Sequence, residues 1–329
     1  MAITGPASYP PTMSLFAGHI EEANNVLPQP VVLVLPTFKT TMTLAQFTAL
    51  RDSIVAQGNT IQSRLTAVQI VRGNIKLKKE QLIKWINMFN SRLDSDFQGT
   101  EYYDSRPLAP SLNDGQAVFN EPLRATLSLW EQINEGPAPF GVTLPLTLGD
   151  GTDFGSFAST VSSLQFLFNE EGRKEGYVKV ARSRRNRMQD RAYEAMLVYR
   201  EGAANRFVNF PELIDSLPRL TPLPGHTPEA VNASVVFEAP DSFKVVYSAS
   251  TDATLESYQL RGHVGDDYDP DLAVVLGTNQ PGDPREFVKT FGLTQPGARV
   301  VLKVYVILTT GNEAGSPAMS VQRPLAAAA

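Results

Sequence analysis

The chain contains no cysteine and only three histidines among its 329 residues. The absence of thiols excludes disulfide bonds, thiolate metal sites, iron–sulfur clusters and cysteine nucleophiles. The histidines, His19, His226 and His263, stand far apart in sequence, which argues against a histidine-rich metal site. The signatures of phosphate-binding loops, serine-hydrolase elbows and zinc proteases are missing as well. We therefore expect a protein that is not an enzyme and needs no cofactor.

Neither sign of charge dominates, because 29 lysines and arginines stand against 34 aspartates and glutamates, a net charge of −5. This balance argues against a chain that binds nucleic acid or membrane over its whole surface. The most apolar stretch near the start, residues 26–38, holds three prolines and is too short to span a bilayer. The first twenty residues lack the features of a Sec signal peptide. We expect no membrane span. The localisation stays undetermined, because a cytoplasmic protein, a particle-associated protein and one exported by a non-Sec route all fit the sequence.

Two long segments carry apolar residues three or four positions apart, the spacing of a packed helix or coiled coil. The first begins at a capping box, Thr43 to Gln46, and is closed by Gly99. The second begins beyond Asp153, a good N-terminal cap, and a shorter helical pattern ending at Gly136 lies between the two. Each long helix would measure about 80 Å if unbroken. This pattern predicts a long antiparallel helical bundle, or stalk, over residues 41–207.

Before the bundle, residues 1–40 are rich in proline and predict an extended arm with one strand. The strand consists of five aliphatic residues between Pro30 and Pro36: Val31, Val32, Leu33, Val34 and Leu35. Such a strand must be buried somewhere, because it would promote aggregation in water. Two destinations fit the sequence. The strand packs on its own chain, or it adds to a sheet edge of a neighbouring subunit as an interface.

After the bundle, residues 208–231 carry five prolines and form a linker, and the hydrophobic period then changes to two. Seven short runs rich in valine, tyrosine and threonine follow within residues 232–324, which predicts an all-β sandwich. Residues 325–329 form a tail that we expect to be disordered. The predicted fold class is therefore multidomain α and β, a helical stalk followed by a sandwich.

Two motifs in residues 232–324 resemble fibronectin type III domains. Residues 257–261, Ser-Tyr-Gln-Leu-Arg, resemble the third strand of that family, and residues 312–317, Asn-Glu-Ala-Gly-Ser-Pro, are similar to its turn before the last strand. The sequence departs from the family at Val246 or Tyr247, where its core tryptophan would stand, and near Val300, at its corner tyrosine. The resemblance implies a fold and a spacer or contact surface, and no catalytic residue. A helical region followed by such a domain also resembles uncharacterised bacterial proteins.

Four aspartates, Asp266, Asp267, Asp269 and Asp271, crowd one expected loop of the sandwich. Carboxylates at alternate positions supply the oxygen ligands that Ca²⁺ prefers, so the loop is a weak candidate for a calcium site. The glycine and the distal glutamate of an EF-hand are missing, and Pro270 interrupts the run. The alternative is an acidic loop exposed to solvent.

Residues 170–191 of the second long helix carry eight basic and four acidic residues, and a run of lysines, Lys76, Lys78, Lys79 and Lys84, stands on the first. Side by side, the two runs would form a basic girdle, with Arg182, Arg184 and Arg185 as candidate interface residues. Such a patch fits an acidic protein surface better than nucleic acid, and a solvated helix face is the alternative. The sandwich has a net charge of −4, eleven acidic against seven basic residues, which suits head-to-tail contact between copies.

The sequence favours a non-enzymatic structural protein that self-assembles as a homo-oligomer, in a filament, layer or particle, through the stalk and the terminal arm. The alternative is a binding or adhesion module that displays the sandwich on a helical stalk.

Overall fold

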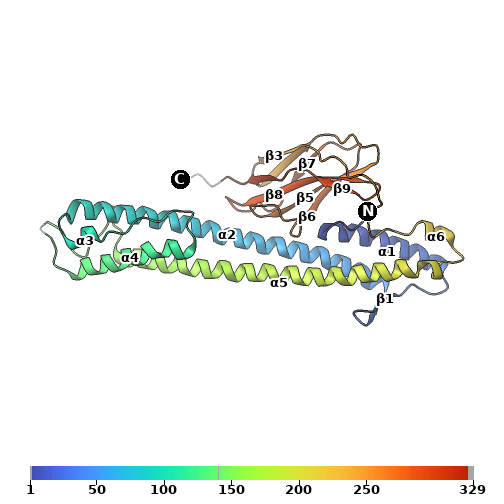
Figure 1. The fold of residues 1–329 in the computed structure, drawn as a ribbon, viewed down its shortest axis with the longest axis horizontal. Coiled ribbons are helices and arrows are strands. Elements are labelled where there is room, and N and C mark those ends of the chain that lie inside the picture. Colours follow the sequence, from blue (N-terminus) through green and yellow to red (C-terminus); the bar gives the residue numbers. More distant parts are fainter. Residues whose placement is uncertain (1, 140, 325–329) are drawn as a thin grey trace. The chain divides into compact units, whose positions relative to one another are not determined.

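The computed structural model describes residues 2–139 and 141–324. Two helices of 53 residues dominate it, α2 (Leu44–Asp96) and α5 (Phe154–Arg206), which run antiparallel and pack together (Figure 1). The strands that follow form a β-sandwich. The predicted architecture, a long helical bundle followed by a β-sandwich, is confirmed. Among the described residues, no helix combines the length and the apolar character that crossing a membrane requires.

The chain divides into two compact units, and both long helices contribute to each of them. The first unit holds the residues up to Ala67 together with those from Gly176 onward, and the second holds Val68–Glu175. Neither boundary falls in the proline-rich segment 208–231, where the sequence suggests a domain boundary. That segment includes a short helix, α6 (Pro211–Asp215), and Leu213 and Leu220 pack into the core of the first unit.

The ends of the long helices form where the capping residues stand. The Thr43 N–H donates to Gln46 Oε1 (2.9 Å) and the Gln46 N–H donates to Thr43 Oγ1 (3.3 Å), which is the predicted capping box. At the start of α5, the Ser156 N–H donates to Asp153 Oδ1 (2.7 Å). Gly99 follows the end of α2 with a φ of 79°, a left-handed conformation that suits glycine. Gly73 lies inside α2 without ending it.

The second unit packs α4 (Gln116–Glu135) and the short α3 (Glu101–Asp104) on one side of the α2–α5 pair. Trp130 of α4 lies at the centre of its core, with ring centroids 5.1 Å from Phe89 and 5.7 Å from Phe157. Lys79 is buried in the same unit, where its Nζ donates to the carbonyl oxygens of Leu112 (3.1 Å) and Asp114 (2.6 Å). Burial lowers the pKa of Lys79. This lysine therefore fixes a loop in place and adds nothing to a basic surface.

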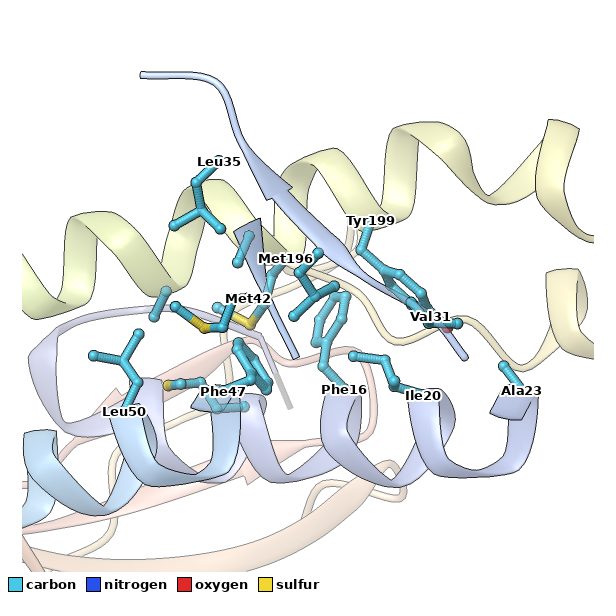
Figure 2. Packing of buried hydrophobic residues seen from close by; sticks show 14 of the residues in the cluster. Phe16, Ile20, Ala23, Val31, Leu35, Met42, Phe47, Leu50, Met196 and Tyr199 are labelled. Carbon is cyan, nitrogen blue, oxygen red and sulfur yellow. The ribbon is translucent and has the colours of Figure 1, made fainter. Parts of the chain in front are cut away.

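The N-terminal segment corrects the expectation of an extended arm. It contains a 3₁₀ turn, η1 (Pro6–Ser8), an 18-residue helix, α1 (Tyr9–Val26), and a hairpin of β1 (Leu33–Leu35) and β2 (Thr40–Met42). Pro10 and Pro11 interrupt nothing, because they stand in the first turn of α1, where no N–H has a partner within the helix. Apolar residues at helical spacing, Met13, Phe16, Ile20 and Ala23, bury one face of α1 (Figure 2).

The strand predicted as an interface is half buried in its own chain. Val31, Leu33 and Leu35 pack into the core that Figure 2 shows, between α1 and the C-terminal part of α5, whereas Val32 and Val34 are exposed. The alternation follows from the strand period of two. β1 pairs with β2 and with no other strand among the described residues. Folding back on the chain removes these three side chains from water, which is the first of the two destinations that fit the sequence, and contact with a neighbouring subunit stays a prediction.

The sandwich consists of two sheets with the strand orders β3-β4-β7 and β10-β8-β5-β6, and β9 pairs with β8. The strands are β3 (Ala233–Glu238), β4 (Ser242–Tyr247), β5 (Leu255–Val264), β6 (Val274–Asn279), β7 (Glu286–Lys289), β8 (Arg299–Leu308), β9 (Glu313–Gly315) and β10 (Met319–Gln322). Seven of them overlap the predicted runs, and β9 is an addition. The expected tail, 325–329, lies outside the described residues.

The central strand β5 is buried on both faces. Tyr258 and Leu260 point into the sandwich core, as alternation requires. The opposite face carries polar side chains that are at most 5% exposed: Ser257, Gln259, Arg261 and His263. The outer face of an antiparallel sheet is commonly solvated, so this burial shows that other parts of the molecule cover it.

Candidate interface between the sandwich and the helices

The loop between β5 and β6, residues 265–273, rests on both long helices within the first unit. On α2, the amide of Gln62 holds both ends of the loop. Its Oε1 accepts a hydrogen bond from the Val264 N–H (3.1 Å), and its Nε2 donates to the Leu272 carbonyl (2.7 Å). Gln62 is only 6% exposed. A buried amide with both its donor and its acceptor satisfied fixes one orientation of the loop, because any slip would leave polar groups unpaired.

On α5, Arg185 makes the deepest contact with the loop. It is 4% exposed, and its guanidinium donates to the Asp271 carbonyl and to Asn186 Oδ1 (3.1 Å). Burial lowers the pKa of Arg185, and the neighbouring Arg182 acts in the same direction. The negative charges of Asp269 and Asp271 oppose this shift. The acidic loop therefore compensates a buried cation of the helix.

Arg182 adds a more exposed ion pair, one turn earlier on α5. Its Nη1 lies 3.6 Å from Asp269 Oδ2 and its Nη2 lies 3.2 Å from Asp271 Oδ2. The attraction between the basic helix and the acidic sandwich, expected between copies, thus operates within one chain. Arg184, the third predicted interface residue, is exposed.

Close approach of the two surfaces depends on a glycine. A Cβ on Gly58 of α2 would lie 3.3 Å from Val274 Cγ1 at the start of β6. That contact is tight, so glycine allows the strand to lie near the helix. Leu65, two turns further along α2, packs against the core residues of the sandwich. The interface therefore combines an apolar contact with buried and exposed polar contacts.

The four aspartates of this loop do not gather into a calcium site. Asp269 and Asp271 are held by Arg182, and Asp266 lies 3.5 Å from Arg299. Asp269 Oδ1 also accepts the Asp271 N–H (2.8 Å). Among the described residues, no group of three or more histidine, aspartate or glutamate side chains is placed to hold a metal ion. Arg182 of α5 and Arg299 of β8 balance the negative charge of these aspartates, the role that the calcium hypothesis gave to Ca²⁺.

The predicted basic girdle does not form, because the register of the helices separates its two halves. In the second unit, Arg72 of α2 pairs with Glu171 (2.7 Å) and Glu175 (2.6 Å) of α5. In the first unit, Gln57 Nε2 donates to the Ala181 carbonyl (3.1 Å). The lysines at 76–84 therefore face residues of α5 in the 160s, and the arginines at 182–185 face residues of α2 in the 50s.

Comparison with known proteins gives only partial similarities. No family model and no curated protein matches the chain. Among solved structures, the FN1–FN3 domains of chicken CNTN1 match 32% of this chain at 16% identity, with a TM-score of 0.26. An Fn3-like protein from Clostridium thermocellum matches 30% at 17% identity, with a TM-score of 0.25 and 96% of that protein covered. Pectate lyase PelI from Erwinia chrysanthemi matches 27% at 16% identity, with a TM-score of 0.23. The alignments cover only 33% of the chicken chain and 28% of the Erwinia chain.

Proposed function

We propose that the protein is a non-enzymatic structural component that assembles with other copies of itself through its helices. The supporting observation is an open groove of about 730 Å³ between α2 and α5 in the second unit. Leu77 on one wall is 61% exposed and Phe166 on the other is 63% exposed. Large apolar side chains at such exposure, facing one another across a groove, mark a protein–protein contact surface.

The groove lies away from the side that α4 covers. Phe166 is two residues from the buried Leu164, which places it about 200° further around α5. Leu77 stands in the same relation to the buried Ile75 on α2. Packing of α4 therefore buries one side of the helix pair and leaves the groove without a covering element from the second unit.

The shape of the groove favours a second copy as its occupant. Ser162 and Ser163 lie one turn before Phe166 on the same wall of the groove. The large ring of Phe166 therefore stands next to two small side chains. A two-fold interface needs such self-complementarity, because each copy presents the same surface. The paired helices of this unit offer a face of about 40 Å by about 20 Å, which matches the roughly 800 Å² per partner of a stable interface.

Size-exclusion chromatography with light scattering tests this proposal on the full chain. We expect the wild type to elute above its monomer mass of 36.0 kDa and the double variant Phe166→Ser, Leu77→Ser to elute as a monomer. The matched control is Leu108→Ser, because Leu108 is even more exposed but lies outside the groove. A wild type that stays monomeric at about 100 μM, or a double variant that assembles like the wild type, contradicts the proposal.

A second candidate is a binding module, supported by the free face of the sandwich. Val236 and Val288 stand in register on either side of Lys244 on the outer face of the β3-β4-β7 sheet, and both are more than half exposed. The outer face of the other sheet is buried, so this face remains for a partner. A monomeric wild type in the experiment above favours this second candidate.

A further inference from the structure

His263 occupies the point where the docked loop leaves β5, and it is 2% exposed. Its Nε2 lies 2.8 Å from the backbone nitrogen of Asp269, and its Nδ1 lies 3.0 Å from the carbonyl oxygen of Val264. A backbone N–H can only donate, so Nε2 must be an acceptor without a proton. Nδ1 then carries the single proton and donates it to Val264. The observed geometry therefore requires a neutral imidazole.

The other two histidines have partners that accept a second proton. His19 lies between the Tyr199 hydroxyl and the Leu213 carbonyl, both 2.7 Å away, and both oxygens can accept from a charged ring. His226 is exposed and contacts the carboxylate of Asp252, whose oxygen can accept a hydrogen bond from a charged ring. All three histidines lie within the described residues. His263 is thus the histidine whose protonation conflicts with its hydrogen bonds.

We propose that His263 is a pH-sensitive latch that releases the sandwich from the helices when its ring becomes protonated. A proton on Nε2 turns its lone pair into a second N–H that faces the Asp269 N–H, so this hydrogen bond is lost. The Asp269 carbonyl also caps the loop, accepting from the N–H groups of Leu272 (3.0 Å) and Ala273 (3.1 Å). Movement of Asp269 therefore reaches the Leu272 carbonyl, which binds Gln62, and the neighbouring Asp271 carbonyl, which binds Arg185.

Charged groups surround the docked loop. Arg182 and Arg185 of α5 contact it, and Nζ of Lys303 of β8 lies 5.0 Å from the centre of the Tyr268 ring. Tyr268, whose ring centroid is 5.8 Å from that of His263, stays neutral because burial raises its pKa. Gln62 of α2 carries no charge. The loop itself carries the acidic groups Asp266, Asp267, Asp269 and Asp271, which once released can pair with a charged imidazole, whereas Glu313 of β9 is already paired with Arg261.

The direction of the pH effect follows from proton linkage. The undocked state binds one proton on His263 that the docked state excludes, so lowering the pH favours release. Imidazoles gain this proton between about pH 5 and 7. The equilibrium constant for docking should therefore be smaller at pH 5.0 than at pH 7.5.

Hydrogen exchange of the full chain at pH 7.5 and pH 5.0, corrected for the intrinsic exchange rate, measures this equilibrium. The N–H groups of Val264, Asp269 and Leu272 report it directly. We expect their protection to fall at least tenfold at pH 5.0 in the wild type, while Val304 in the sandwich core keeps its protection. In His263→Gln, whose amide oxygen can accept from the Asp269 N–H at any pH, protection should not change with pH.

His226→Gln is the matched control, because it removes another histidine of the same compact unit and should retain the wild-type fall. Unchanged loop protection in the wild type overturns the proposal, and so does a fall in His263→Gln as large as that of the wild type. If His263→Gln fails to fold, NMR of the three imidazole rings in the wild type replaces it. The ring of His263 should then titrate together with the loss of loop protection, and titration without that loss contradicts the latch.

Discussion

Replacing Leu164 with aspartate should unfold the second compact unit under conditions in which the wild type is fully folded. Leu164 is completely buried in the core that α2, α4 and α5 share, so the variant places a charge where no water reaches it. We expect a loss of about 4 kcal/mol or more in the free energy of unfolding. Because Trp85 and Trp130 both lie in this core, tryptophan fluorescence during urea unfolding follows the unit selectively.

The control for this variant is Leu108→Asp, a leucine of the same unit that lies outside the groove. Leu108 is 85% exposed, so an aspartate there remains in water and should change the free energy of unfolding by less than about 1 kcal/mol. Equal effects of the two variants, or an unchanged urea midpoint for Leu164→Asp, would contradict the assignment of Leu164 to the bundle core.

Replacing Arg185 with methionine should release the sandwich without unfolding it. The variant removes the donor that binds the Asp271 carbonyl and leaves the carboxylates of Asp269 and Asp271 with Arg182 as their remaining partner on α5. Loss of a buried charged hydrogen bond costs about 2–3 kcal/mol. A cost of about 2 kcal/mol corresponds to a factor of about 30 in an equilibrium constant. We therefore expect the hydrogen-exchange protection of the Leu272 and Val264 N–H groups to fall about 30-fold or more. Circular dichroism should not change.

Arg184→Met controls for the loss of a positive charge on α5, since Arg184 is the exposed neighbour of Arg185. Its loop protection should match that of the wild type. Gln62→Leu approaches the same interface from α2 and should reproduce the effect of Arg185→Met, because it unpairs the Val264 N–H and the Leu272 carbonyl. Wild-type protection in both interface variants would show that these contacts do not hold the loop.

Local signals in the sequence predicted most of the elements of the fold. The capping box at Thr43 and the cap at Asp153 are read from neighbouring residues, and the hydrogen bonds that form there are local. The change of hydrophobic period after residue 231 likewise separates helices from strands. The N-terminal helix was missed because Pro10 and Pro11 suggest an extended chain. Their place in the first turn depends on where the helix begins, which proline content alone does not show.

The candidate interface was predicted only in part, because its residues come from segments far apart in sequence. The charges of Arg182, Asp269 and Asp271 were visible, but a count of charge cannot tell a partner in the same chain from one in another copy. Gln62 and His263 carried no signal, since a polar residue at these positions looks like any solvated side chain. Lys79 was counted with the basic run of the first long helix, but it is buried, and the loop carbonyls that it binds explain why it is tolerated there.

The central claim is that the sandwich is docked on the helices through the β5–β6 loop, and a disulfide across this interface tests it most directly. The natural chain has no cysteine, so Gly58→Cys combined with Val274→Cys introduces a single pair of thiols. A Cβ on residue 58 would lie 3.3 Å from Val274 Cγ1, so side chains at these two positions touch and a pair of thiols there can meet. Gly58→Cys with Val288→Cys is the control, because Val288 is exposed on the opposite sheet. The docked arrangement predicts rapid and nearly complete oxidation of the first pair in the native protein at pH 7.5 and little in the control, counted by mass spectrometry. Equal and slow oxidation of both pairs would contradict it.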